Sequence, residues 1–201
     1  VGVIEAGDVQ WMTAGGGIMH EEMPQERQGK MEGLQLWVNL PARLKLSRPR
    51  YQEILAGQIP VVELPGGASA RVIAGELRGV RGPVREIAAD PTYLDVSLPA
   101  GGTVYLPVET GHSAFAYLFE GSAEFDVRGQ LQATRLLVFA DGNSVVANAG
   151  AGGARFLLVS GKPLGEPVAR YGPFVMNTRA EIQQALEDLR NGTFVYREPG
   201  A

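Results

Sequence analysis

The clearest structural signal in the sequence is Thr92-Tyr-Leu-Asp-Val-Ser-Leu-Pro-Ala-Gly-Gly-Thr-Val-Tyr-Leu106. Short, largely apolar runs lie on both sides of Gly101-Gly102, which is typical of two strands joined by a tight turn. The same pattern predicts further strands over Ala70–Ala74, Val84–Ile87, Ser113–Phe119, Ala123–Val127, Gln130–Phe139, Ser144–Ala147 and Arg155–Ser160. Many short strands separated by Gly or Asp-Gly turns predict an antiparallel sandwich or barrel rather than alternating strands and helices.

Upstream of this region the pattern is less regular. Short strands are expected at Val3-Ile4, Val9–Met12, Ile18-Met19 and Leu34–Val38. The stretch Pro41–Pro65 is rich in Arg and Pro and shows little of the hydrophobic periodicity typical of a strand or helix. It is therefore interpreted as a connector between two domains. Near the end, Thr178 and Glu181 form a capping box ahead of the apolar stripe Ile182, Ala185, Leu186 and Leu189, which predicts a helix ending at Asn191-Gly192.

Composition limits the classes of function. The 201 residues are 45% hydrophobic and 20% charged, which favours a folded, β-rich chain. Cys is absent, which excludes disulfides, thiolate metal ligands and a cysteine nucleophile, and a reducing cytosol is allowed. A net charge of −4 argues against direct nucleic-acid binding, and no apolar run is long enough to span a membrane.

Histidine chemistry is restricted to two positions. His20 lies in Gly17-Ile-Met-His-Glu-Glu-Met-Pro24, and on a strand His20 and Glu22 share one face while Glu21 takes the other. One imidazole and one carboxylate form half of a mixed nitrogen and oxygen site suited to iron or another divalent transition metal. A pair on a surface strand, or a hydrogen-bonded core histidine, explains the same pattern.

Other candidate features favour plain structural interpretations. His112 is expected in a turn, since no partner arrangement for a nucleophilic triad accompanies it. Gly15–Gly17 and Gly150–Gly153 open no helix and lack the Lys-Ser/Thr of a phosphate loop, so they are interpreted as tight turns. Trp11, Met12, Met19 and Met23 flank the His-Glu pair and either line an apolar pocket or pack in the core.

Four longer segments together resemble the pirin family, and their order and spacing extend the resemblance over the chain. They are Gly7–Gly15, Gly17–Pro24, Gly33–Pro41 and Tyr171–Thr178. The resemblance implies an all-β bicupin, with two antiparallel β-barrel domains and a C-terminal helix packing back on the first. It implies residues 1–55 as the C-terminal part of an incomplete N-terminal cupin plus connector, 56–175 as the second cupin, and 176–201 as the helix and tail.

Pirins hold one metal, usually iron, in the N-terminal cupin through three His and one Glu, and some oxidise quercetin with O₂. The resemblance implies that His20 and Glu22 are metal ligands and that Glu22 also acts as a catalytic base. Two further His ligands are expected upstream of Val1, because the chain is expected to begin inside the first cupin as a fragment of a longer protein. In the second cupin, the ligand positions fall on Pro107, Glu109 and Ser113, so that half is expected to be metal-free.

The leading hypothesis is therefore an iron-dependent dioxygenase of the quercetin 2,3-dioxygenase type, acting on a small aromatic, flavonol-like substrate and O₂. The alternative is a non-enzymatic, redox-sensing regulator that binds a protein partner, as described for animal pirins. A metal-free structural remnant is the third possibility. The expected location is cytoplasmic, or nuclear for an animal protein.

Overall fold

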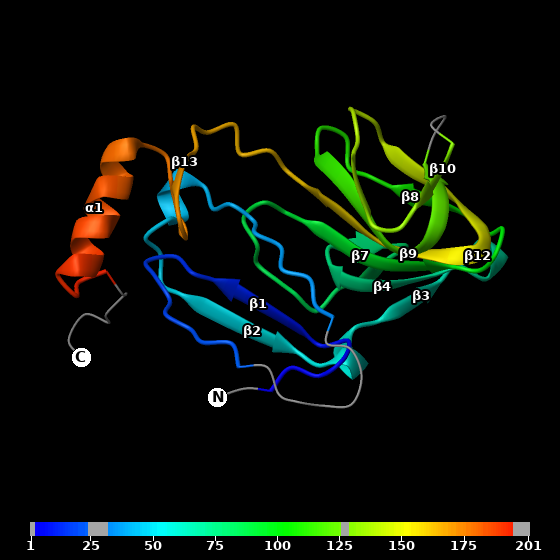
Figure 1. The fold of residues 1–201 in the computed structure, drawn as a ribbon, viewed down its shortest axis with the longest axis horizontal. Coiled ribbons are helices and arrows are strands. Elements are labelled where there is room, and N and C mark those ends of the chain that lie inside the picture. Colours follow the sequence, from blue (N-terminus) through cyan, green and yellow to red (C-terminus); the bar gives the residue numbers. More distant parts are fainter. Residues whose placement is uncertain (1–2, 24–31, 126–128, 195–201) are drawn as a thin grey trace. The chain divides into compact units, whose positions relative to one another are not determined.

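The computed structural model describes residues 3–23, 32–125 and 129–194, and these fall into two compact units. One unit comprises Val1–Trp11 and Gln52–Pro163, and the other comprises Met12–Tyr51 and Leu164–Ala201. Each unit is built from segments that are far apart in the sequence. The first contains the main sheet and the second contains the C-terminal helix (Figure 1).

The main sheet has eight strands, in the order β10-β9-β12-β7-β4-β3, with β11 added to β9 and β8 added to β12. Every pairing is antiparallel. The strands are β3 (Val61–Glu63), β4 (Ser69–Ala74), β7 (Thr92–Leu98), β8 (Thr103–Pro107), β9 (Ser113–Phe125), β10 (Gln130–Gln132), β11 (Arg135–Val138) and β12 (Ser144–Gly161). A separate hairpin is formed by β5 (Glu76–Leu77) and β6 (Val80–Arg81).

One large apolar core lies on the inner face of this sheet. Alternate residues of the strands supply it, for example Leu94, Val96 and Leu98 on β7. Phe125 and Phe156 meet edge to face, with ring centroids 5.0 Å apart. Burial of these side chains is the main force that holds the unit together.

The two longest strands bend without leaving the sheet. β9 and β12 pair along most of their length, with register shifts between Ala149 and Ala154 and between Arg155 and Phe156. The predicted strand break at Glu120-Gly121 and the predicted tight turn at Gly150–Gly153 are therefore wrong, since both segments continue as strand. Gly121 has a φ of +69°, a conformation open to glycine, which lets the chain change direction inside the ladder.

The strand predictions are otherwise confirmed for β4, β7 and β8, with an end shifted by one residue in β4 and β8. Gln130–Phe139 divides into β10 and β11, and Val84 forms only an isolated bridge with Ala74. The last two residues of the predicted strand Ala123–Val127 lie outside the described residues.

The N-terminal region is less regular than predicted. β1 (Val9–Thr13) confirms one strand and pairs with β2 (Arg50–Ile54), while Val3-Ile4, Ile18-Met19 and Leu34–Val38 form none. A strand needs a partner for its backbone groups, and no described strand pairs with these three segments. Pro41–Pro65 is also more structured than a connector, because it contains β2, β3 and the short 3₁₀ helices Ala42–Leu44 and Ala56–Gln58.

The second unit carries α1 (Arg179–Arg190) beside the hairpin β13 (Ala169–Tyr171) and β14 (Phe174–Met176) (Figure 1). Ile182 and Ala185 of α1 are buried with Phe174 of β14, whereas Leu189 at the end of the predicted stripe is largely exposed. Thr178 and Glu181 make the predicted capping box.

The predicted all-β class, with a C-terminal helix that packs on sheet strands, is confirmed. The helix shares its compact unit with residues 12–51, which supply part of the predicted N-terminal domain. The proposed domain boundaries after residues 55 and 175 stay a prediction. No helix in the described ranges combines the length and the apolar character needed to cross a membrane.

Candidate functional site

The candidate site follows a glycine turn at the end of β1. The Gly17 N–H donates to the Ala14 carbonyl at 2.9 Å, which closes the turn, and the Gly16 N–H donates to the Ser47 carbonyl at 2.8 Å. Gly15 has a φ of +50°, and a Cβ placed there would collide with the Ser47 carbonyl. Gly17 has a φ of +116°, and a Cβ there would meet the Phe194 ring at 2.7 Å. The prediction of a tight turn at Gly15–Gly17 is therefore confirmed.

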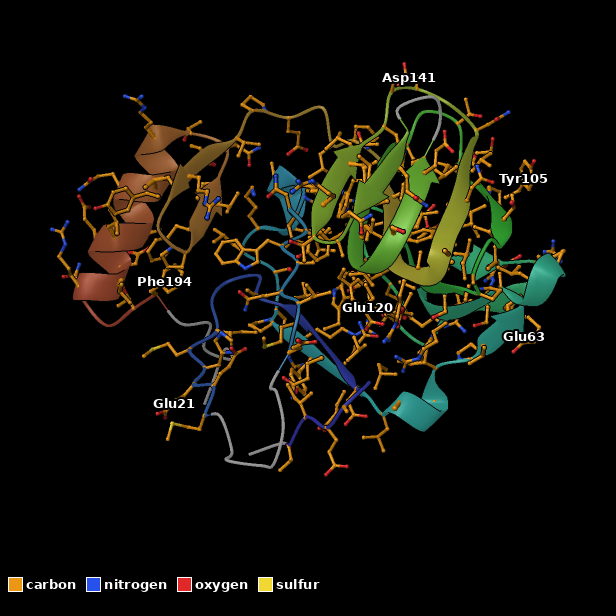
Figure 2. The ribbon with its side chains drawn as sticks, turned by 45° about the vertical axis from the view of Figure 1, so that its right-hand side comes forward. Glu21, Glu63, Tyr105, Glu120, Asp141 and Phe194 are labelled. Carbon is orange, nitrogen blue, oxygen red and sulfur yellow. The ribbon has the colours of Figure 1, made fainter. Side chains whose placement is uncertain are left out.

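His20 and Glu22 lie close together on the segment that leaves this turn. The Nδ1 atom of His20 is 3.9 Å from Oε1 of Glu22, and the side chains are 46% and 64% exposed. Glu21 between them is also exposed, and its side chain extends away from the segment (Figure 2). The backbone over residues 18–23 is irregular, so the predicted strand geometry, with His20 and Glu22 on one face and Glu21 on the other, is wrong.

The separation of the two donor atoms is compatible with a shared metal. Ligand atoms of a zinc-like ion lie about 2.0–2.2 Å from it, so two ligands of one ion are at most about 4.4 Å apart. A transition-metal site needs more than two protein ligands, however. Among the described residues no group of three His, Cys, Asp or Glu side chains is placed to hold an ion. The pair fits part of a ligand set, and the described residues do not complete it.

Apolar side chains near the pair are exposed rather than packed. Met19 and Met23 are 77% and 70% exposed, so the core-packing interpretation is wrong for both. Trp11 does pack, against the small apolar cluster around Ile54, Ile73 and Val84. The pocket interpretation stays a prediction for both methionines.

His112 lies in the turn that precedes β9, as predicted. Its N–H donates to the Glu109 carbonyl at 3.0 Å, and its side-chain Nδ1 is buried with no hydrogen-bond partner among the described residues. Pro107 ends β8 and Ser113 begins β9, while Glu109 starts the turn between them. The metal-free character expected of this half stays a prediction.

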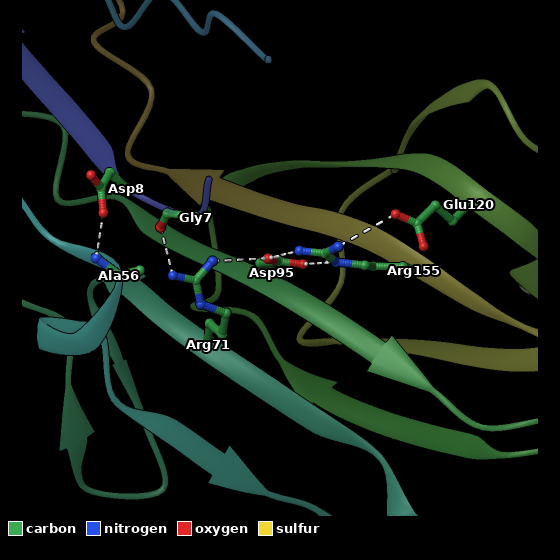
Figure 3. Close-up of polar contacts among 7 residues, drawn as sticks. All are labelled: Gly7, Asp8, Ala56, Arg71, Asp95, Glu120 and Arg155. Atoms are coloured by element: carbon green, nitrogen blue, oxygen red, sulfur yellow. Dashed lines mark hydrogen bonds and ion pairs between the residues drawn. The ribbon is translucent and has the colours of Figure 1, made fainter. Parts of the chain in front are cut away.

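An ion-pair network across the main sheet was not anticipated from the sequence. Asp95 on β7 is only 6% exposed and accepts two hydrogen bonds from Arg155 on β12, at 2.9 and 2.8 Å. Arg71 on β4 lies 3.5 Å from Asp95 and donates to the Gly7 carbonyl at 2.7 Å (Figure 3). The hydrogen bond to Asp95 is the main reason why the pKa of Arg155 is raised. The sequence does contain one indication of this network: Asp95 is an acidic residue inside the apolar run Tyr93–Leu98, and a buried carboxylate needs a charged or hydrogen-bonding partner.

A second polar cluster lies in the unit that contains α1, which comprises Met12–Tyr51 and Leu164–Ala201. Lys45 is buried and donates to Asn39 Oδ1 at 2.8 Å and to the Val175 carbonyl at 3.0 Å. Burial lowers the pKa of Lys45, and the nearby carboxylates of Glu166 and Glu181 oppose this effect. A single Lys in an Arg-rich stretch gave no sign of this burial.

Known proteins match the chain over nearly its whole length. Residues 93–195 match the model of the pirin C-terminal cupin domain, and residues 1–38 match that of pirin. A pirin-like protein of Caulobacter vibrioides is 44% identical over 96% of this chain and 70% of its own length. A Pseudomonas aeruginosa protein, provisionally named as a quercetin 2,3-dioxygenase, is 42% identical over 95% of this chain and 69% of its own length.

The crystal structure of a quercetin 2,3-dioxygenase from Acinetobacter baumannii has the same fold. It superposes with a TM-score of 0.81 at 32% identity, over 95% of this chain and 68% of the other. Residues 93–195, which match the pirin C-terminal cupin domain, contain most strands of the main sheet. The sequence, the fold and these relatives place the chain in the pirin family of cupin proteins.

Proposed function

We propose that this chain carries part of the metal site of an iron-dependent dioxygenase of the quercetin 2,3-dioxygenase type. The proposal rests on one observation, the His20–Glu22 pair with donor atoms 3.9 Å apart. It is supported by relatives and a structural neighbour that are named as quercetin 2,3-dioxygenases. In this proposal the remaining two ligands are histidines upstream of Val1.

His20 and Glu22 would have different roles. His20 supplies a neutral imidazole nitrogen, a ligand that suits iron and several other divalent metals. Glu22 supplies a carboxylate that binds the metal and accepts a proton from the substrate hydroxyl. A bound metal supplies Lewis acidity and a fixed arrangement of the reactants.

The exposed setting of the pair suits a substrate that enters from solvent. His20 and Glu22 are both about half exposed or more, and Met19 and Met23 beside them offer flexible apolar surface. Methionine makes favourable contacts with aromatic rings, so a flavonol-like substrate matches this surface. The regulatory alternative, with a protein partner, stays a prediction.

Oxygen uptake with quercetin tests this function. We expect iron-loaded protein that includes the residues upstream of Val1 to consume O₂ when quercetin is added. Glu22→Gln should lower the rate at least about 100-fold, because a catalytic base typically contributes that much. Glu21→Gln changes the neighbouring carboxylate in the same way and should leave the rate unchanged. No oxygen uptake by fully iron-loaded protein would contradict the proposal.

A further inference from the structure

A hollow of about 300 Å³ lies over the main sheet, far along the chain from His20 and Glu22. It is lined by Ser97, Leu98, Glu120, Gly121 and residues 152–155. Its volume is at the lower end of the range for small-molecule pockets. It forms where β12 bulges, because residues 150–153 lie between the pairs Ala149↔Ala123 and Ala154↔Gly121, opposite Ser122 alone.

The polar groups of the hollow share one face of the sheet. Arg155 pairs directly with Ser97 across β12 and β7, so their side chains lie on the same side. A second register shift pairs Arg155 with Glu120 but Phe156 with Leu118, which leaves Phe119 unpaired. This bulge brings both Phe119 and Glu120 to Arg155. The guanidinium lies 5.1 Å from the centre of the Phe119 ring, and its Nη1 is 3.3 Å from Oε1 of Glu120.

Arg155 is held rigidly before any ligand arrives. Its Nε and Nη2 atoms donate to the two oxygens of buried Asp95, in the paired geometry that fixes a guanidinium plane (Figure 3). At the outer edge of the guanidinium, Nη1 donates to the Glu120 carboxylate, whose side chain is 58% exposed. A fixed donor beside a movable acceptor, with the Ser97 hydroxyl nearby, can bind a molecule that carries several hydroxyl groups.

The charges at the hollow favour a neutral ligand. Arg71 and Arg155 carry two positive charges and Asp95 and Glu120 two negative ones, and ion pairs link all four. An anion would face the exposed Glu120 carboxylate, and a cation would face Arg155. A neutral polyol can donate to Glu120 and accept from Arg155 at the same time.

We propose that this hollow binds a small neutral polyol of about monosaccharide size. Glycine permits the backbone conformation at the wall of the hollow. Gly153 has a φ of +78°, and a Cβ there would lie 2.8 Å from the Leu98 carbonyl. At Gly152 an added Cβ would meet no atom of the described residues within 4 Å. The site does not depend on the metal or on the proposed dioxygenase activity.

Titration of isotope-labelled protein with myo-inositol and with D-glucose tests the site by NMR. We expect saturable shifts of the Gly152, Gly153 and Arg155 amides. Gly152→Leu places a side chain on the lining and should abolish them. Glu120→Ala removes one hydrogen bond to a charged group and should weaken binding at least about ten-fold. Gly142→Leu is the matched control, since an added Cβ at Gly142 also meets no described atom within 4 Å, and binding should be unchanged.

Three results would overturn the proposal. One is the absence of saturable shifts with either polyol. Another is binding by Gly152→Leu or by Glu120→Ala that equals that of the wild type. The last is stronger binding of sodium acetate or ethylammonium chloride at the same amides, which would indicate a site for a charged ligand. Glu120 is exposed, so its variant gives a result even where Gly152→Leu does not fold.

Discussion

Asp95 is a buried charged residue of the main sheet that pairs with two arginines. It is almost fully buried and neutralises Arg155 through two hydrogen bonds, with Arg71 beside it. A buried carboxylate is tolerated only when it is paired and hydrogen-bonded in this way. The network also connects the sheet to the Gly7 carbonyl, ahead of β1 (Figure 3).

Replacing Asp95 by Ala should destabilise the protein by about 2–4 kcal/mol. The value is below the upper range for a broken buried ion pair because Arg155 keeps contact with water. Urea denaturation followed by circular dichroism measures the difference. Glu120→Ala removes the exposed partner of the same arginine and should cost less than about 1 kcal/mol. Equal losses for the two variants would contradict this account of the network.

Gly15 is the residue on which the turn before His20 depends. Gly15→Ala should destabilise the protein by about 1–3 kcal/mol, because alanine is strained at a φ of +50° and its Cβ would collide with the Ser47 carbonyl. Gly57→Ala is the control, since in the part of the chain that the structure describes no atom lies within 4 Å of a Cβ added at Gly57. Thermal unfolding of both variants measures the effect. An equal change in the unfolding temperature of the two variants would contradict the expectation that a side chain at Gly15 strains the turn.

At the scale of single elements, α1 was the easiest to predict because its signals are local. Thr178 and Glu181 lie three residues apart, and each caps the backbone of the other at 3.2 and 2.7 Å. β9 and β12 were harder, because Gly121 and the glycines near residue 150 look like turn residues. Only pairing with distant strands shows that they are bends within a strand.

The capping box makes a pH-dependent prediction. Hydrogen bonds from Thr178 and Asn177 lower the pKa of Glu181 below its ordinary value of 4.5. The stability that Glu181 contributes is therefore complete above pH 4.5 and is lost as the pH falls through its lowered pKa. Glu181→Gln should be less stable than wild type at pH 7, and the difference should shrink in acid. A constant difference from pH 7 to pH 3 in urea titrations would contradict this.

At the scale of the whole molecule, the two compact units differ in what holds them together. The main sheet encloses a large apolar core, whereas the unit with α1 has a small cluster around Phe174 and relies on the Lys45 hydrogen bonds. A unit with a small core is expected to open more readily than one with a large core.

Lys45→Met should therefore weaken mainly the unit that contains α1. The variant leaves Asn39 Oδ1 and the Val175 carbonyl without their donor, which should cost about 1–3 kcal/mol at pH 7. Native-state hydrogen exchange should show faster exchange in β13, β14 and α1, with little change in β7 and β12. Faster exchange in all of these elements alike would contradict the separate behaviour of the two units.

The same residue gives a pH dependence in the same direction as that of Glu181, but in the alkaline range below pH 10.5. Because the pKa of Lys45 is lowered from 10.5, the folded state releases this proton before the unfolded state does. The unfolding free energy of the wild-type protein should therefore rise relative to that of Lys45→Met as the pH increases from the lowered pKa towards 10.5. A difference that stays constant or falls in this window would contradict the burial of a charged Lys45.

The sequence predicted the fold class and the neighbourhood of the candidate site, but not the form of the site. His20 and Glu22 are close because they are two residues apart. Their irregular, exposed backbone follows a glycine turn that is hydrogen-bonded to Ser47 and leaves no room for a Cβ beside Phe194, and both residues are distant in the sequence. The Asp95–Arg155 pair, 60 residues apart, depends in the same way on strand pairing that no local pattern specifies.

Metal content is the most direct test of the central claim, that His20 and Glu22 are ligands of a pirin-type metal site. Elemental mass spectrometry would be combined with intact mass on wild type, His20→Ala and the control Glu21→Gln, each made with and without the residues upstream of Val1. We expect about one iron per chain in the longer wild type and in the control, and a large loss of iron in His20→Ala. Iron retained at the same level in His20→Ala would contradict it.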